Sequence, residues 1–143
     1  MSNSASPVLP VLTERLTASL IDVTPVKATD RVVVIGHGTL PMLLAFLRRG
    51  CRMAAELRPD VVAPDAEPAD LAWITGVMKT GEYDNALRAA LRRIGRHGRL
   101  AVDVTAMAAR RGLRRVLRWL RGNGLTVDAT HCIGSRIVVL AHG

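Results

Sequence analysis

Four consecutive residues, Gly36, His37, Gly38 and Thr39, are the part of the sequence best suited to bind a ligand. They follow a β-branched run at 31–36 and precede an apolar segment. Glycines at the end of a strand permit a sharp turn and let a ligand approach the backbone closely. A helix that begins after such a turn presents unpaired N–H groups to an anionic group. The spacing predicts a binding turn, in which His37 is also a candidate base.

The other reactive side chains have no recognisable catalytic or metal-binding spacing. None of the remaining histidines, His97, His131 and His142, stands at a metal-ligand spacing from another histidine or a cysteine. His131 and Cys132 are adjacent, so in a strand they point to opposite faces. No Gly-x-Ser-x-Gly motif supports a serine nucleophile. We therefore predict no metal site and assign no catalytic residue.

Arginines are concentrated in the second half of the chain. Residues 88–121 hold eleven arginines and one acid, whereas residues 56–84 hold seven acids and two bases. In an expected helix at 106–121 the arginines lie opposite the apolar face. Such a face is either solvated, with arginine stems covering apolar surface, or an electrostatic footprint for nucleic acid or anionic lipid. The sequence leaves both interpretations open, although an aromatic content of 3% argues against specific single-strand recognition.

The composition indicates what kind of protein positions these residues. A chain of 143 residues suffices for one domain with a modest core, which we assign to 11–143 after a flexible lead-in at 1–10. A hydrophobic content of 49% excludes a disordered chain despite the net charge of +8. Cys51 and Cys132 lack CxxC spacing, and neither a signal peptide nor a membrane span is apparent. We expect a cytoplasmic protein.

Strand and helix signals alternate along the chain. This order predicts a doubly wound, Rossmann-like, mostly parallel α/β sheet in three layers, closed by an antiparallel β-hairpin. Only about fourteen residues separate Glu56 from Asp70, little more than one parallel crossover needs. We therefore expect the sheet to be pruned near its second and third strands, and a homodimer to close over the exposed edge. Helices are expected at 11–22, 40–49, 82–95 and 106–121, and strands at 31–36, 51–56, 61–63 (short), 70–75, 99–104, 125–132 and 136–141.

The turn and its flanking segments resemble the class I S-adenosylmethionine-dependent methyltransferases. The sharpest match is Thr-Asp-Arg-Val-Val-Val-Ile-Gly-His-Gly-Thr at 29–39. Weaker matches are Gly-Arg-Leu-Ala-Val at 98–102 and Gly-Ser-Arg-Ile-Val-Val-Leu at 134–140. As a pattern the resemblance extends over 11–143. It implies S-adenosylmethionine as the cofactor and methyl transfer to a small-molecule substrate.

The resemblance also implies a cofactor site built from several segments. The turn would hold the methionine part, an acid at the end of the second strand would bind the ribose, and an Asp followed by a small residue would contact the adenine. These places fall on Gly36, His37, Gly38 and Thr39 in the turn and on Asp65 and Ala66 for the adenine. The ribose place falls on Leu57 in register, so Glu56, one residue earlier, is the candidate acid. Thr75 or His37 would border the methyl acceptor.

Two further features depart from the family pattern. Leu40 and Pro41 replace the third glycine of the turn, where Leu40 is expected to crowd the site, and no Asn/Asp-Pro-Pro-Tyr follows Thr75. One alternative is therefore a catalytically degenerate relative that acts as a dimeric scaffold or ligand-binding module. A second is a basic nucleic-acid-associated protein that uses the arginines of 106–121. A third is a nicotinamide or flavin dinucleotide protein, because Glu56 lies about twenty residues after the turn.

Overall fold

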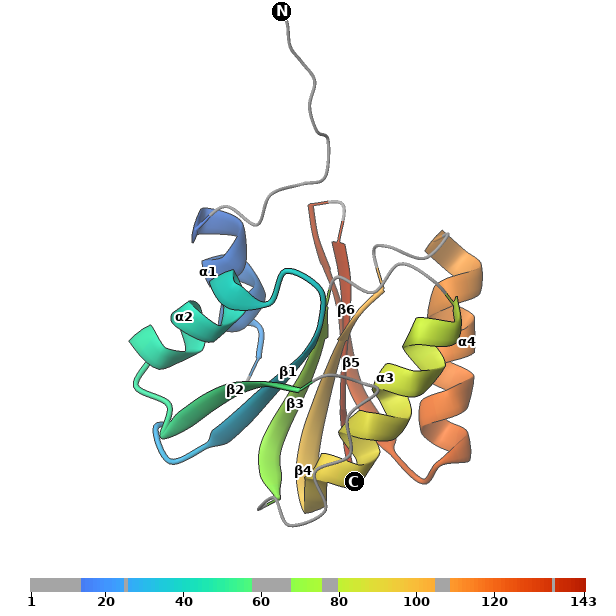
Figure 1. The fold of residues 1–143 in the computed structure, drawn as a ribbon. Helices are drawn as coiled ribbons and strands as arrows, with labels where there is room; N and C mark the ends of the chain where they lie inside the picture. Colours follow the sequence, from blue (N-terminus) through green and yellow to red (C-terminus); the bar gives the residue numbers. More distant parts are fainter. Residues whose placement is uncertain (1–13, 25, 58–67, 76–79, 105–108, 135) are drawn as a thin grey trace, which may run out of the picture.

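A six-stranded sheet with helices on both faces forms the described part of the chain (Figure 1). The computed structural model describes residues 14–24, 26–57, 68–75, 80–104, 109–134 and 136–143. The elements in chain order are α1 (Glu14–Asp22), β1 (Arg31–Gly36), α2 (Leu40–Arg48), β2 (Met53–Leu57), β3 (Ala69–Thr75), α3 (Thr80–Arg93), β4 (Ile94–Asp103), α4 (Ala109–Gly122), β5 (Thr126–Ile133) and β6 (Arg136–His142).

The sheet has the doubly wound topology that the sequence predicts. Its strand order is β2-β1-β3-β4-β6-β5. β1 pairs in parallel with β2 and β3, and β3 pairs in parallel with β4. β6 runs antiparallel to both β4 and β5, which confirms the closing hairpin. The chain leaves β1 in one direction to form β2 and later returns to β1's other side as β3, so a topological switch point lies at the carboxyl end of β1.

Two apolar cores, one on each face of the sheet, explain why the central strands are apolar throughout. Val33 and Ile35 of β1 pack on the side of α3 and α4, whereas Val32 and Val34 pack on the side of α1 and α2. On the α2 side, the rings of Phe46 and Trp73 meet edge to face, with their centroids 6.1 Å apart. This arrangement confirms the three-layer architecture: α2 packs over β2 and β1, and its Phe46 reaches Trp73 of β3.

Two element boundaries differ from the sequence prediction. Ile94 begins β4 and pairs with Ala69, whereas the helical spacing placed it in a helix ending at 95. Gly98 allows this irregular start, since a Cβ there would lie 2.5 Å from the Cβ of Ile94. The second strand begins at Met53 rather than at 51, because the chain bends at Arg52, whose N–H donates to the carbonyl of Asp30.

Several predicted segments lie outside the described residues. They are the lead-in at 1–10, the start of the first helix at 11–13, the short strand at 61–63 and residues 105–108 before α4. The other expected elements begin and end within a few residues of the observed ones. No helix in the described ranges is both long and apolar enough to cross a membrane.

Candidate functional site

The carboxyl ends of β1, β3 and β4 and the amino end of β6 meet at one edge of the sheet. Gly36 pairs with Thr75 there, and the side chain of Arg136 contacts that of Asp103. Crevices outside the carboxyl ends of strands, at the switch point, are where open α/β sheets bind ligands. The predicted turn therefore emerges where the topology favours a site.

Gly36 and Gly38 perform different tasks in the turn. Gly36 has a φ of +133°, and a Cβ at this position would lie 1.6 Å from the carbonyl oxygen of Thr75. No other residue fits between the ends of β1 and β3. Gly38 has a φ of +63°, yet a Cβ there would meet no atom within 4 Å. Gly36 is thus required by packing, whereas Gly38 leaves an open backbone surface that a ligand can approach.

Thr39 starts α2 and leaves its first turn without a side-chain cap. The residue is buried, and its carbonyl accepts the N–H of Leu43 at 3.0 Å. Its hydroxyl forms no capping hydrogen bond, and Pro41 in the first turn has no N–H to donate. The helix end beside the turn therefore offers backbone donors and a partial positive charge to an anionic group.

Leu40 does not crowd the turn, contrary to the expectation from sequence. Its side chain is 63% exposed and lines an open groove of about 430 Å³ between α1 and α2. Ile21 and Leu44 also line this groove, and no residue predicted to hold the cofactor is among its lining residues. The replacement of the third glycine therefore leaves the turn accessible.

A buried polar network lies beneath the edge of the sheet. The Arg136 guanidinium donates to Oδ2 of Asp103, and the Thr75 hydroxyl donates to the same oxygen at 3.5 Å. The Tyr83 hydroxyl donates to the carbonyl of Asp103 at 2.6 Å. Burial raises the pKa of Tyr83 well above its usual value, and the negative charge of Asp103 adds to this shift. Thr75 is thus oriented toward Asp103, and these four residues form a buried hydrogen-bonded cluster.

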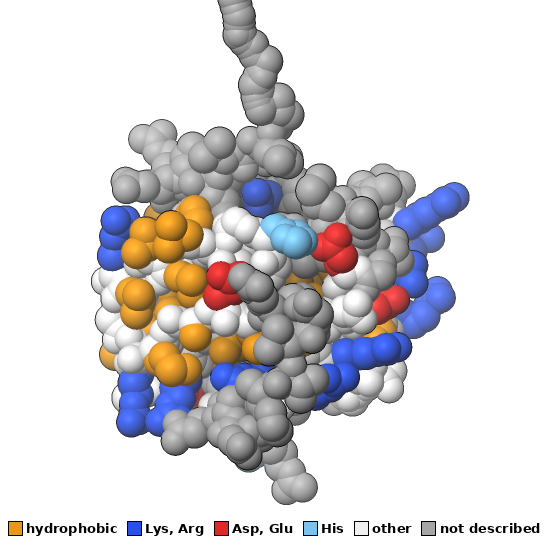
Figure 2. Space-filling view, in the orientation of Figure 1, with side chains coloured by type: hydrophobic (Ala, Val, Ile, Leu, Met, Phe, Trp, Pro, Cys, Tyr) orange, Lys and Arg blue, Asp and Glu red, His pale blue; other side chains and the backbone are white. Residues whose placement is uncertain are grey.

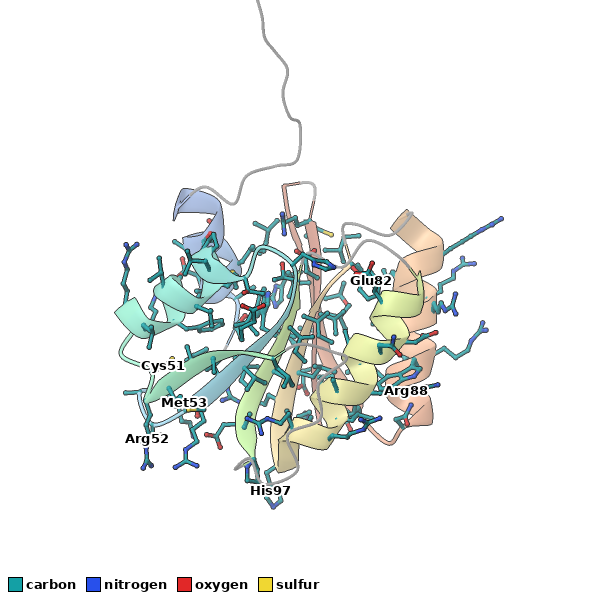
Figure 3. All side chains as sticks on the ribbon, in the orientation of Figure 1. Cys51, Arg52, Met53, Glu82, Arg88 and His97 are labelled. Atoms are coloured by element: carbon teal, nitrogen blue, oxygen red, sulfur yellow. The ribbon has the colours of Figure 1, made fainter. Side chains whose placement is uncertain are left out.

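His37 and Glu82 face each other at the mouth of the site. Nε2 of His37 lies 2.8 Å from Oε2 of Glu82, and the histidine side chain is 72% exposed. Glu82 belongs to the first turn of α3 (Figure 3). A carboxylate on one ring nitrogen orients the imidazole and leaves Nδ1 directed elsewhere. His37, oriented by Glu82, therefore offers a proton acceptor or hydrogen-bond partner beside the turn.

Of the other predicted cofactor residues, the structure describes Glu56 but neither Asp65 nor Ala66. Glu56 is exposed and pairs with Val34, two residues before Gly36, and Leu57 after it packs into the core on the α3 side. Asp65 and Ala66 lie outside the described residues. Within the described ranges no group of three or more His, Cys, Asp or Glu side chains is arranged to hold a metal ion.

Three residues of the site were missed by sequence reasoning. Glu82, Asp103 and Arg136 each had a local signal: an acid in the first turn of a helix, an acid at the end of a strand, and a base at the start of one. Each signal is common on protein surfaces, so none singled out its residue. Each residue is identified as part of the site only by the partner that it contacts in the folded chain. Asp103 and Arg136, for example, are 33 residues apart in the sequence.

Solved structures of methyltransferases have this fold. A precorrin-6y C5,15-methyltransferase from Geobacter metallireducens matches with a TM-score of 0.69 at 14% identity, over 97% of this chain and 93% of that one. A TehB-like SAM-dependent methyltransferase from Corynebacterium glutamicum matches with a TM-score of 0.63 at 17% identity, over 88% and 85%. The glycopeptide N-methyltransferase MtfA complexed with S-adenosyl-L-homocysteine matches with a TM-score of 0.68 at 10% identity, over 92% and 89%.

Sequence comparison adds no closer relationship. No protein-family model matches the chain, and no curated protein matches its sequence. The structural likeness nevertheless extends over nearly the whole chain, so the molecule has the fold of the class I S-adenosylmethionine-dependent methyltransferases, as the sequence resemblance predicted.

Proposed function

We propose that this chain is a cytoplasmic methyltransferase that transfers a methyl group from S-adenosylmethionine to a small molecule. The observation that carries the proposal is the turn at the switch point, where Gly38 leaves an open backbone surface beside the uncapped start of α2. The cofactor supplies an activated methyl group on its sulfonium. Because this group is already reactive, the protein's task is mainly to align the acceptor with it.

Each part of the site has a role in this proposal. The backbone at Gly36 and Gly38 holds the methionine part of the cofactor, and the first turn of α2 receives its carboxylate. His37, oriented by Glu82, borders the acceptor and accepts a hydrogen bond or a proton from it. Glu56 for the ribose, and Asp65 with Ala66 for the adenine, remain predictions from the resemblance. Both cysteines are free thiols, in agreement with a reducing compartment.

The test is a titration of the chain with S-adenosylmethionine and with S-adenosylhomocysteine, followed by calorimetry and by NMR. We expect saturable binding of both, with amide shifts centred on 36–40. A nicotinamide dinucleotide is titrated in the same way, and binding of it instead of S-adenosylmethionine would favour the dinucleotide-binding alternative. Absence of binding at millimolar ligand would contradict the proposal. Binding without turnover across a panel of alcohols, phenols and amines would instead favour the catalytically degenerate ligand-binding module.

A second candidate function is supported by the arginines of α3 and α4. They form an exposed basic surface along the right-hand side of Figure 2, and among the described residues the acid paired with it is Asp84, 3.6 Å from Arg115. This charge fits a nucleic-acid phosphate backbone. A gel shift with duplex and single-stranded RNA at low and high salt tests it, and absence of binding at low salt removes it. The members of the surface are Arg88, Arg92, Arg111, Arg114, Arg115, Arg118 and Arg121.

A further inference from the structure

The helices α3 and α4, which carry the basic surface, run side by side in the same direction. α3 connects β3 to β4, and α4 connects β4 to β5, which runs in the direction of β4 because both strands are antiparallel to β6. Both helices pack on one apolar core (Figure 1). Oδ2 of Asp84 in α3 lies 3.6 Å from Nη2 of Arg115 in α4. These two residues therefore lie at about the same height along the pair of helices.

The arginines of the basic surface form two rows. In α3, Arg88 and Arg92 follow Asp84 at intervals of four residues, which places all three on one side of the helix. In α4, exposed arginines recur at intervals of three or four residues from Arg111 to Arg121. At the helical rise per residue, the α4 row is about 15 Å long. Packed helices lie about 8–10 Å apart, so the two rows are parallel and close together.

The charge of these rows is nearly uncompensated. Of the arginines in the basic surface, Arg115 is the one with an ion-pair partner among the described residues. Elsewhere in the described chain, Arg49, Arg99 and Arg136 each contact a carboxylate. A concentration of like charge attracts a polyanion, and a guanidinium binds phosphate through two parallel hydrogen bonds. The basic surface therefore fits a partner with several closely spaced phosphates.

Two rows of charge fit a duplex better than a single strand. A double helix carries one phosphate charge per about 1.7 Å of its axis, divided between two strands, or about nine charges over 15 Å. Single strands are bound largely by stacking their bases on aromatic side chains. In the described parts of α3 and α4, Tyr83 is buried and Trp119 packs against the core. The helices thus offer phosphate contacts without a stacking platform.

An anionic lipid surface fits these helices less well. Helices that bind such surfaces insert apolar side chains beside their basic ones. The large hydrophobic side chains that are exposed in the described ranges are Leu40, Leu44, Leu47 and Met53, all on α2 or β2. Figure 2 shows hydrophobic side chains at the left of the molecule and the arginines at its right. The basic surface therefore lacks the apolar component of a membrane-binding face.

The pairing of the helices also determines what part of a duplex they can contact. The major groove is about 12 Å wide and admits one helix. Two helices about 8–10 Å apart, each about 10–12 Å across, are together roughly 20 Å wide. Figure 3 shows Arg88 projecting from α3 on the side of α4, where a strand bound to both rows would lie. The pair is too wide to enter the groove, so its arginines meet phosphates rather than base edges.

We propose that the basic surface binds the phosphate backbones of a nucleic-acid duplex without reading its sequence. The α4 row and the pair Arg88 and Arg92 both contribute to this contact. The proposal rests on the second candidate function and specifies its partner, but it does not depend on cofactor binding. Duplex RNA and duplex DNA share the required chemistry, and the experiment distinguishes them.

The test is fluorescence anisotropy with labelled duplexes of about 20 base pairs, in RNA and in DNA, each in two unrelated sequences. The separated strands and vesicles of phosphatidylglycerol are the alternative partners. We expect at least one kind of duplex to bind about fivefold or more tightly than its strands, with its two sequences within about threefold of each other. The logarithm of the affinity should fall with the logarithm of salt concentration with a slope of about −4 to −6.

Each contrary outcome has a separate meaning. Tighter binding to single strands would overturn the duplex proposal and leave the second candidate function standing. Binding to vesicles alone, or to nothing at low salt, would overturn both. A preference of more than about tenfold for one sequence would overturn the inference that bases are not read, since one mismatched base pair already costs about 1–3 kcal/mol in specific complexes.

Variants of the two rows test the geometry. Arg88→Gln with Arg92→Gln removes the α3 row, and Arg118→Gln with Arg121→Gln shortens the α4 row. Each pair should weaken duplex binding at least about tenfold at low salt and make the salt slope shallower by about 2. Circular dichroism and S-adenosylhomocysteine binding should not change.

The matched control is Arg48→Gln with Arg52→Gln, which removes the same charge from exposed positions outside the basic surface. We expect its duplex affinity to stay within about threefold of that of the natural chain. An equal loss in the control would show that net charge alone attracts the duplex and would overturn the proposed surface. Unchanged binding by either row variant would also overturn it.

Discussion

At the residue scale, Gly36 couples the binding turn to the stability of the sheet. Replacing it with alanine forces a Cβ to within 1.6 Å of the Thr75 carbonyl at a φ of +133°. Overpacking and a backbone conformation reserved for glycine together should lower the free energy of unfolding by at least about 3 kcal/mol. Urea denaturation of Gly36→Ala measures this loss.

The matched control is Gly38→Ala, which has a positive φ but open space around the added Cβ. Its cost should be limited to the left-handed backbone, about 1–2 kcal/mol. Equal losses for the two variants would show that contact with Thr75 is not what requires glycine at position 36.

The buried hydroxyl of Tyr83 should make the fold sensitive to alkaline pH. Burial and the charge of Asp103 raise its pKa in the folded chain above the unfolded value of roughly 10. Its contribution is therefore complete below about pH 10 and is lost as pH rises toward the folded pKa, because the unfolded chain ionises first. Urea unfolding at about pH 9, 10 and 11 should show this decline.

Tyr83→Phe isolates this effect. The variant should lose about 1 kcal/mol with the hydrogen bond to Asp103, yet decline less above pH 10. Burial also raises the pKa of Cys51, so both proteins should be compared in a Cys51→Ala background. Because the chain has one tyrosine, the tyrosinate absorbance reports Tyr83 alone. Ionisation at the pKa of free tyrosine would contradict the prediction.

The role of a single residue could be predicted only where it depends on its neighbours in the sequence. The sequence identifies Gly36 and Gly38, because a turn between a strand and a helix needs them. It does not distinguish the glycine that packs from the glycine that stays open, since that difference depends on the Thr75 carbonyl of a neighbouring strand. For the same reason the Arg136–Asp103 pair could not be predicted before the strand order was known.

At the element scale, the position of the binding turn depends on how α2 packs against the core, because the turn leads directly into this helix. Phe46 anchors this helix against Trp73 of β3, and both side chains are fully buried. Phe46→Ala should lower stability by about 3–5 kcal/mol. It should also weaken S-adenosylhomocysteine binding, since the start of the helix belongs to the proposed site. Chemical denaturation and calorimetry of the same variant measure the two effects.

Leu44→Ala provides the comparison on the same helix, because its side chain faces outward into the groove with α1. We expect a stability change below about 1 kcal/mol and unchanged affinity for S-adenosylhomocysteine. A Phe46→Ala protein that remained folded and bound the ligand normally would show that the turn does not depend on the docking of α2.

Elements were predictable where one signal dominated. β1 is apolar on both faces and ends in glycine, so its bounds matched the structure. The start of β4 was missed because Ile94 continues the helical spacing of α3, and only pairing with Ala69 draws it into the sheet. Long-range pairing competes with local periodicity at that point, and the tertiary contact prevails.

At the scale of the whole molecule, a ligand that binds only the folded chain must stabilise it. At a hundred times its dissociation constant, S-adenosylhomocysteine should add about 2.7 kcal/mol to the free energy of unfolding. For a chain of this size the gain corresponds to a rise of roughly 5–10 °C in the thermal midpoint. Gly38→Ala should unfold at a slightly lower temperature and show a much smaller rise, because its Cβ occupies the open surface of the turn. Arg114→Glu, on the opposite face, should show the full rise. If S-adenosylhomocysteine did not change the thermal midpoint of the natural chain, the proposal that this fold binds the cofactor would be contradicted.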